Sequence, residues 1–262
     1  MNMKTVILCG GTGTRMKEET EFKPKPLVLV GCKPILWHIM KIYAQYGFNE
    51  FIVALGYKGN MIKEYFLNER SFVNNFTLDT KTGNLIFHNN DCDDFKITFV
   101  ETGEDSLTGE RVRRVAPYIG DEDFMVTYGD GVADINIHAL LGFHTSQQTL
   151  GTITAVIPST RFGFLDIDES RKKLKSFYQH KVTHDTDNKS KEYINGGFMI
   201  FKNEVLNMIE PHSMIENIFP RLAEMQQMSV YKHLGRWKCM DTYKEVEELN
   251  KIWDQGAFWK IW

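Results

Sequence analysis

The stretch TVILCGGTGTR, residues 5–15, indicates the fold class of this chain. Its first four residues form a short, continuously apolar run that leads into glycines, a pattern typical of a strand buried on both faces of a parallel sheet. An expected strand at 51–55 lies between expected helices at 34–46 and 60–67. This alternation predicts an α/β fold, a mixed sheet with helices on both faces.

Length, net charge and the distribution of apolar residues limit the number of domains and the kinds of partner that we expect. The chain has 262 residues, 42% of them hydrophobic, and a formal net charge of −3. We expect a single domain over 1–262 and neither a nucleic-acid nor a membrane partner, because no global positive field or bilayer-length apolar run is present. With no cleavable signal pattern and no C-x-x-C pair, we expect a cytoplasmic protein.

Two regions stand apart in composition. An insertion at about 68–100 is rich in Asn, Asp and Thr, and the triplet TGN at 82–84 predicts a β-hairpin turn. A second subregion spans about 158–201 and is strand-like. The insertion and the aromatic C-terminus could form subunit contacts of a homo-oligomer, or the aromatic residues could cover the core. Those aromatic residues are Trp253, Phe258, Trp259 and Trp262.

The loop GGTGTR, residues 10–15, is a candidate phosphate site. Glycines allow positive φ and bring backbone N–H groups close to an anion. Neither common nucleotide fingerprint fits. Gly13 is followed by Thr14 and Arg15 rather than Lys-Ser/Thr, and Met16 stands where the third Rossmann glycine would be. The alternative is a tight turn beside an incidental arginine.

The segment KPKP, residues 23–26, adds candidate cations. Proline favours extended geometry in the residue before it, so alternation predicts that Lys23 and Lys25 point the same way. Together with Arg15 they form a predicted polyphosphate clamp. The alternative is a surface linker with two solvated lysines.

Two carboxylates are candidate Mg²⁺ ligands. Asp130, in TYGDG, follows an expected strand at 124–127, and ligands of open α/β sheets bind at such strand ends. Asp241, in CMDT, could supply a second carboxylate, as phosphate–magnesium sites use one or two. The alternatives are an Asp-Gly turn for Asp130 and a helix N-cap for Asp241.

The segment DSLTGERVRR, residues 105–114, leads into an expected helix at 111–118. Ser106, Thr108 and Arg111 could contact a base, ribose or phosphate there. A plain Ser/Thr helix cap is the open alternative.

Taken together, these segments resemble the sugar-1-phosphate nucleotidyltransferases, in their cytidylyltransferase branch. Only residues 68–100 and 168–193 fall outside the resemblance. The other matching segments include GCKPILWHIMKIY (31–43), INGGFMIF (194–201) and GRWKCMDTYKEV (235–246). The resemblance implies a Rossmann-like nucleotidyltransferase sheet and transfer of CMP from CTP to a phosphorylated acceptor, with release of pyrophosphate.

The resemblance also implies residue roles. Arg15 and Lys25 would be catalytic and neutralise phosphate charge, and Asp130 and Asp241 would bind Mg²⁺. The nucleotide would contact Leu8, Gly10, Gly11, Thr12, Gly13, Thr14, Ser106, Thr108, Arg111 and Gly129. The acceptor would contact Tyr128, Gln179, His180, Lys181, Asn195, Gly196 and Gly197.

One departure bears on the acceptor. Gln179-His180-Lys181 stands where sugar-directed members carry Glu-Lys-Pro. Losing a polar contact in a site that reads hydroxyls costs much discrimination. We therefore expect L-glutamine phosphate as acceptor, giving CDP-L-glutamine, as in a related capsule-phosphoramidate branch. Glucose 1-phosphate, giving CDP-glucose, is the alternative, and a catalytically idle nucleotide-binding regulator is the alternative of another class.

Overall fold

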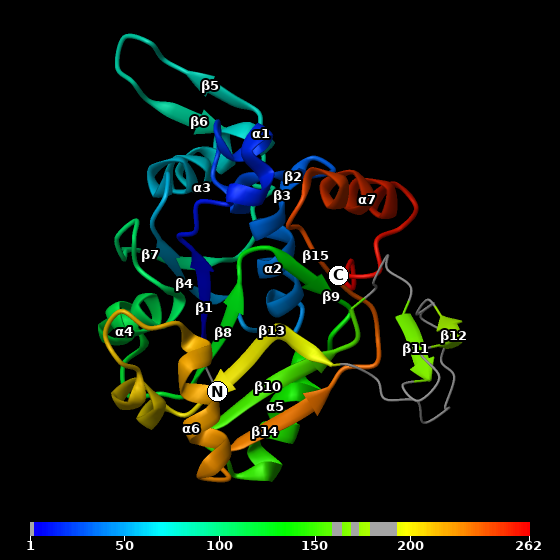
Figure 1. Ribbon diagram of the computed structural model, residues 1–262. Coiled ribbons are helices and arrows are strands. Elements are labelled where there is room, and N and C mark those ends of the chain that lie inside the picture. The colour runs from blue at the N-terminus through cyan, green and yellow to red at the C-terminus, as the bar shows by residue number, and fades with distance from the viewer. Residues whose placement is uncertain (1–2, 159–163, 169–172, 179–192) are drawn as a thin grey trace.

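The computed structural model describes residues 3–158, 164–168, 173–178 and 193–262 (Figure 1). Its centre is a seven-stranded sheet in the order β14-β10-β13-β8-β1-β4-β7. β13 runs antiparallel to both of its neighbours, whereas the other four ladders are parallel. The strands are β1 (Lys4–Cys9), β4 (Glu50–Leu55), β7 (Lys96–Glu101), β8 (Phe124–Tyr128), β10 (Gly151–Val156), β13 (Ile194–Phe201) and β14 (Met228–Lys232).

Helices cover both faces of this sheet, as predicted. Successive side chains of a strand point to opposite faces, so β1 places Ile7 in one core cluster and Val6 in the other. Helix α2 (Ile35–Ala44) packs in the cluster of Ile7, and α4 (Thr108–Ile119) in that of Val6. The remaining α-helices are α1 (Lys17–Thr20), α3 (Gly59–Val73), α5 (Ile137–Gln147), α6 (Phe219–Glu224) and α7 (Tyr243–Asp254).

Several short elements connect the strands and α-helices. The short 3₁₀ helices are η1 (Thr14–Met16), η2 (Lys25–Leu27), η3 (Asn203–Met208) and η4 (Ile215–Ile218). The short ladders pair β2 (Leu29–Val30) with β3 (Lys33–Pro34), β9 (Gly131–Ala133) with β15 (Trp237–Cys239), and β11 (Phe164–Asp168) with β12 (Lys173–Tyr178). Among the described residues, no helix is long and apolar enough to cross a membrane.

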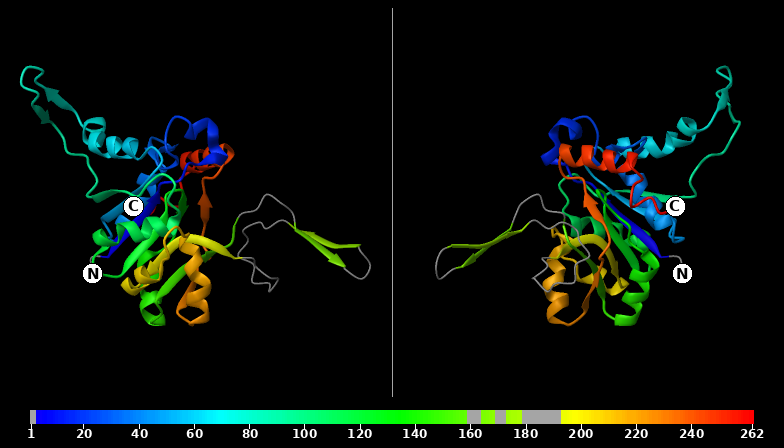
Figure 2. Two further views of the ribbon diagram at one scale, coloured as in Figure 1. Left: turned by 60° about the vertical axis from the view of Figure 1, so that its left-hand side comes forward. Right: turned by 90° about the vertical axis from the view of Figure 1, so that its right-hand side faces the viewer.

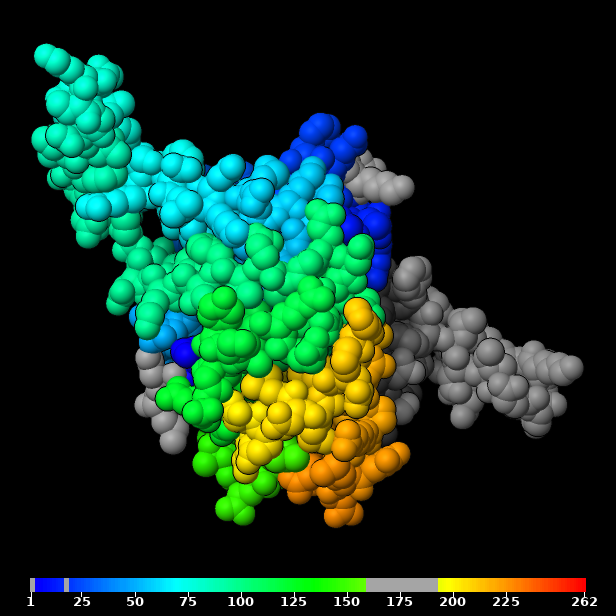
Figure 3. Space-filling view, turned by 90° about the vertical axis from the view of Figure 1, so that its left-hand side faces the viewer, coloured from blue at the N-terminus to red at the C-terminus, as the bar shows by residue number. Residues whose placement is uncertain are grey.

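The insertion forms the predicted β-hairpin. β5 (Phe76–Leu78) pairs with β6 (Leu85–Phe87), and Gly83 in the turn has φ +75°. The hairpin projects from the body as an arm (Figures 2 and 3). Leu85 and Ile86 are 49% and 62% exposed on it. An isolated hairpin is only marginally stable in water, so a contact that buries these apolar side chains would stabilise it.

The C-terminal aromatic residues cover the core, which was one of the two expected outcomes. Trp259 is fully buried, and its indole N–H donates to His38 Nδ1 at 3.3 Å. His38 Nε2 in turn donates to the Val30 carbonyl at 2.8 Å. Burial lowers the pKa of His38 to about 4, so the imidazole is neutral and serves both bonds.

Candidate active site

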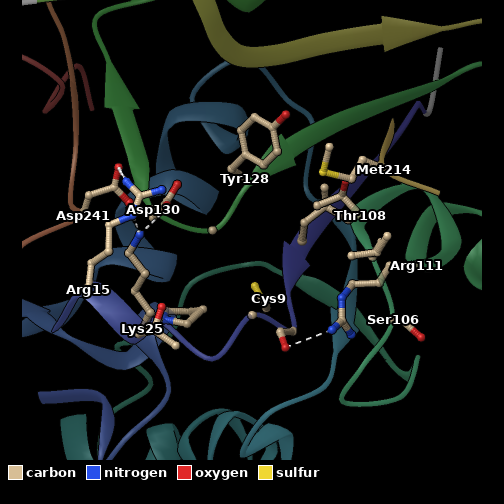
Figure 4. Close-up of a pocket in the computed structure, with 18 residues that line it drawn as sticks. Cys9, Arg15, Lys25, Ser106, Thr108, Arg111, Tyr128, Asp130, Met214 and Asp241 are labelled. Carbon is tan, nitrogen blue, oxygen red and sulfur yellow. Dashed lines mark hydrogen bonds and ion pairs between the residues drawn. The ribbon is translucent and has the colours of Figure 1, made fainter. Parts of the chain in front are cut away.

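A cavity of about 370 Å³ opens at the carboxyl ends of β1 and β8 (Figure 4). This is the edge at which open α/β sheets bind ligands. Most of the predicted nucleotide, catalytic and metal residues line it, although Thr12 is not among them. The predicted residues that do are Leu8, Gly10, Gly11, Gly13, Thr14, Arg15, Lys25, Ser106, Thr108, Arg111, Tyr128, Gly129, Asp130 and Asp241.

The glycine loop needs its glycines for two different reasons. Gly13 has φ +64°, a conformation that side-chain-bearing residues rarely adopt. At Gly10 a Cβ atom would lie 2.0 Å from the guanidinium of Arg111, so a side chain there would displace that group. Gly11, in contrast, faces open space.

Arg111 ties the loop to the neighbouring strand ends. Its guanidinium donates to the carbonyls of Gly10 (2.9 Å), Leu55 (3.0 Å), Gly103 (2.8 Å) and Glu104 (3.0 Å). It also donates to a threonine hydroxyl at 2.7 Å. These bonds identify Arg111 as a support of the loop backbone. Its predicted direct contact with the nucleotide stays a prediction.

The cations and carboxylates meet on the opposite side of the cavity. Lys25 Nζ lies 2.5 Å from Asp130 Oδ2 and 2.7 Å from Asp241 Oδ1. Arg15 Nη1 lies 3.1 Å from Asp241 Oδ2. The ladder of β9 and β15 brings the two carboxylates together, because Cys239 pairs with Gly131 and the Met240 N–H bonds to the Asp130 carbonyl at 2.9 Å.

The same contacts set the protonation states. Burial on its own would lower the pKa of Lys25, but Asp130 and Asp241 outweigh it, and the net pKa is raised. Burial would raise the pKa of Asp241, yet the hydrogen bond and charge of Lys25, with the charge of Arg15, hold it below its usual value. Lys25 is therefore an ammonium and Asp241 a carboxylate at neutral pH.

The two KPKP lysines do not point the same way, contrary to the prediction. Lys23 pairs with Glu19 at 2.9 Å and does not line the cavity. The extended geometry stops at Pro24, because the Leu27 N–H bonds back to the Pro24 carbonyl at 2.8 Å and starts the turn η2. A local turn therefore overrides the alternation, and only Lys25 turns inward.

Asp241 is not the N-cap of α7, so that alternative is wrong. Thr242 caps the helix, accepting from the Glu245 N–H at 3.4 Å, and Glu245 reciprocates in a capping box. The Asp241 side chain is thereby left to face Lys25. Asp130 does lie in a turn, between β8 and β9, and faces Lys25 as well.

These carboxylates fit a divalent metal. Two of their oxygens converge on one point, and carboxylate oxygen is the ligand that Mg²⁺ prefers. Within the described residues, no group of three or more His, Cys, Asp and Glu side chains could hold a metal ion by itself. A metal at this pair would therefore need further ligands, such as phosphate oxygens.

Helix α4 begins at Thr108, three residues before the predicted start. Its N-cap is Leu107, without a side-chain cap bond, so the Ser/Thr-cap alternative is wrong. The Thr108 hydroxyl instead accepts from the Ile215 N–H at 3.0 Å. Ser106 donates to the carbonyl of Thr102. Both residues line the cavity.

The acceptor-side residues that the structure describes also lie together. Asn195 Nδ2 donates to the Tyr128 hydroxyl at 3.3 Å and Asn195 Oδ1 accepts from the Gly197 N–H at 3.0 Å. The Gly196 carbonyl accepts from Trp237 Nε1 at 2.8 Å. The predicted residues Gln179, His180 and Lys181 lie outside the described residues.

Glu216 contacts two residues that line the cavity, and sequence reasoning missed it. It lies in η4, accepts the Tyr128 hydroxyl proton in a hydrogen bond, and lies 3.3 Å from the Thr108 hydroxyl. Burial, followed by Glu216, raises the pKa of Tyr128, which keeps the phenol protonated. No motif surrounds Glu216 in the sequence, so only the folded chain reveals it.

Comparison with known proteins gives the family of this chain. Residues 4–254 match the family described as Nucleotidyl transferase. A protein named Probable glucose-1-phosphate cytidylyltransferase, from Bacillus subtilis, is 44% identical over 99% of this chain and 100% of its own length. The Glucose-1-phosphate cytidylyltransferase of Salmonella typhi is 41% identical over the same shares.

Solved structures share the fold at lower identity. A UTP-bound UGPase from Acinetobacter baumannii has a TM-score of 0.69 at 14% identity and covers 97% of this chain and 93% of its own. HddC from Yersinia pseudotuberculosis has a TM-score of 0.66 at 20% identity, covering 96% and 99%. These two likenesses concern the fold alone.

The chain belongs to the nucleotidyl transferase family and is an enzyme that transfers nucleotidyl groups. The resemblance to the cytidylyltransferase branch of the sugar-1-phosphate nucleotidyltransferases is confirmed by these relatives. Enzymes of this family generally use a divalent metal such as Mg²⁺.

Proposed function

We propose that this chain transfers CMP from CTP to a phosphorylated acceptor and releases pyrophosphate. The observation that carries the proposal is the cluster of Lys25, Asp130 and Asp241, which shares one cavity with a glycine loop. Backbone N–H groups, a half-buried ammonium and a carboxylate pair are what a triphosphate and its metal need. The names of the Bacillus subtilis and Salmonella typhi relatives support CTP as the donor.

The proposed chemistry is a single displacement. An oxygen of the acceptor phosphate forms a bond to the α-phosphorus of CTP, and the bond from that phosphorus to the bridging oxygen of pyrophosphate breaks. The acceptor phosphate is ionised at neutral pH, so no general base is required. Arg15 and Lys25 would neutralise charge on the phosphates, and Asp130 and Asp241 would hold Mg²⁺, which supplies further positive charge when bound.

Glucose 1-phosphate, giving CDP-glucose, is the better supported acceptor. The two relatives named for it align over nearly the whole chain. The polar groups of Tyr128, Asn195 and Glu216 gather beside the cavity, and such donors and acceptors suit a polyhydroxyl ligand.

L-Glutamine phosphate, giving CDP-L-glutamine for capsule phosphoramidate modification, is the second candidate. Its specific support is the triplet Gln179-His180-Lys181, which lacks the Glu-Lys-Pro of sugar-directed members. The expected preference for this acceptor rests on that departure alone.

Pyrophosphate release tests both acceptors side by side. With CTP and Mg²⁺, we expect release with glucose 1-phosphate and compare it with release with L-glutamine phosphate. Turnover with L-glutamine phosphate alone would reverse the order of the candidates. CTP binding without release with either acceptor would instead favour the idle nucleotide-binding regulator.

Self-association is part of the proposal. The hairpin of β5 and β6 exposes Leu78, Leu85 and Ile86 on an arm that projects from the body, and exposed apolar patches mark interfaces (Figure 2). We propose that the arm contacts a second copy of the chain in a homo-oligomer. The cytoplasmic location expected from the sequence also remains part of this proposal.

A further inference from the structure

We propose that Lys25 is a built-in cation that occupies the Asp130–Asp241 pair and excludes divalent metal from it until the nucleotide arrives. The inference rests on the proposed function of this site and adds an order of binding to it: metal enters together with the triphosphate.

The geometry places Lys25 on the carboxylate oxygens that a metal shared by the pair would use. One nitrogen, Lys25 Nζ, lies within hydrogen-bond distance of both carboxylates, at 2.5 Å and 2.7 Å. Mg²⁺ binds carboxylate oxygens at about 2.0–2.1 Å. A metal held by these two oxygens would compete with the ammonium for them and would lie close to a like charge. We therefore expect the ammonium to leave when the metal binds.

The Lys25 side chain can move away from the two carboxylates without a change in the backbone. The turn η2 holds its main chain, since the Val28 N–H bonds to the Lys25 carbonyl at 3.0 Å. Its four-carbon stem is flexible, and its charge is a compact point. The stem also lies beside the glycine loop, because a Cβ atom at Gly13 would be 3.5 Å from Lys25 Cβ. A triphosphate on that loop would offer the ammonium new anionic partners nearby.

The neighbouring cations do not share this arrangement. Within the part of the chain that the structure describes, Arg15 forms an ion pair with Asp241 alone, and its side chain is 75% exposed, against 15% for Lys25. Lys23 pairs with Glu19 outside the cavity. Lys23 is thus a matched lysine, two residues away, for control variants.

The test measures Mn²⁺ binding to the full chain without nucleotide, by electron paramagnetic resonance. In Lys25→Met we expect Mn²⁺ to bind at least about tenfold more tightly than in the wild type, because two carboxylates lose their resident cation. Lys23→Met should match the wild type. Adding Asp241→Asn to Lys25→Met should remove the gain, which would locate the bound metal at this pair.

A second measurement does not depend on the variant folding well. The melting temperature of the wild type should be unchanged by millimolar Mg²⁺ alone and should rise with Mg²⁺ and CTP together. Equal or weaker Mn²⁺ binding by Lys25→Met, or a rise of the wild-type melting temperature with Mg²⁺ alone, would overturn the inference. Neither readout needs an acceptor or turnover, so failure of pyrophosphate release would refute the proposed function separately.

Discussion

The guanidinium of Arg111 donates a 2.9 Å hydrogen bond to the carbonyl of Gly10, which lies 101 residues earlier in the chain. Arg111 donates further hydrogen bonds to the carbonyls of Leu55, Gly103 and Glu104. Together these bonds join the ends of β1, β4 and β7 at the edge of the cavity. The loop that faces the ligand is therefore held from behind by one buried side chain.

Replacing Arg111 by Met should both destabilise the protein and weaken nucleotide binding. Several buried carbonyls would lose their donor, and each such loss costs about 1–3 kcal/mol. We expect urea unfolding to show a loss of about 3–5 kcal/mol in total. Arg221→Met, at an exposed position, is the control and should leave stability unchanged within about 0.5 kcal/mol. Wild-type stability in Arg111→Met would refute the supporting role.

Lys25→Ala should lose most turnover. Removing a charged group that meets developing phosphate charge costs about 10²–10³ in kcat. Lys23→Ala should retain near-normal kcat, because Lys23 pairs with Glu19 away from the cavity. Steady-state pyrophosphate release measures both, and near-normal turnover in Lys25→Ala would remove this lysine from the chemistry.

Asp130→Asn should change the metal dependence together with the rate. An amide oxygen is a weaker Mg²⁺ ligand than a carboxylate, so half-maximal activity should require about tenfold more Mg²⁺. Titration of Mg²⁺ at saturating CTP tests this. The exposed Asp254→Asn serves as the control, and an unchanged titration curve for Asp130→Asn would make Asp130 a turn residue only.

His38 should make the fold sensitive to mild acid. Burial lowers its pKa from 6.5 to about 4, so the unfolded chain binds a proton first as pH falls. The contribution of neutral His38 is complete above pH 6.5 and is lost as pH falls from 6.5 towards 4. Between about pH 7 and pH 5 we expect a loss of about 2 kcal/mol from this group.

Urea unfolding at the two pH values measures that loss. His38→Asn should be less stable at neutral pH, because the shorter side chain cannot reach the Val30 carbonyl that Nε2 serves, but its stability should fall less on acidification. His212→Asn, at an exposed histidine, controls for general histidine titration. An equal fall in His38→Asn and wild type would contradict the assignment.

Ile86→Asp should disperse the proposed oligomer. A charge on the apolar arm opposes its burial against a second copy, so sedimentation should show a smaller species. Lys81→Asp, at the exposed hairpin loop, should leave the assembly size unchanged. The same mass for Ile86→Asp and wild type would exclude this face of the arm as the interface.

Features that depend on near neighbours in the chain were predictable from the sequence. The buried strand before the glycines, the alternation with helices and the hairpin turn at Gly83 all follow from local periodicity and local conformation. The membership of Gly10, Gly13 and Arg15 in one cavity followed as well, because a single short loop carries all three.

Predictions from the local sequence pattern were wrong at two places, where a neighbouring residue formed a turn or a helix cap instead. The bond from Leu27 to Pro24 sends Lys23 away from Lys25, and Thr242 displaces Asp241 as the helix cap. In both places a neighbouring residue offers a better hydrogen bond than the pattern assumed. Such competition is decided by geometry that composition does not contain.

The sequence by itself determined the residue types of the site and the strand ends that carry them. Only the tertiary structure decided which of them meet. Lys25, Asp130 and Asp241 converge because β8 lies beside β1 and because β15 pairs with β9, and Glu216 reaches Tyr128 because η4 packs against α4. These contacts span 105, 216 and 88 residues of chain. Their physical cause is the burial of one shared core, which selects strand neighbours without regard to sequence distance.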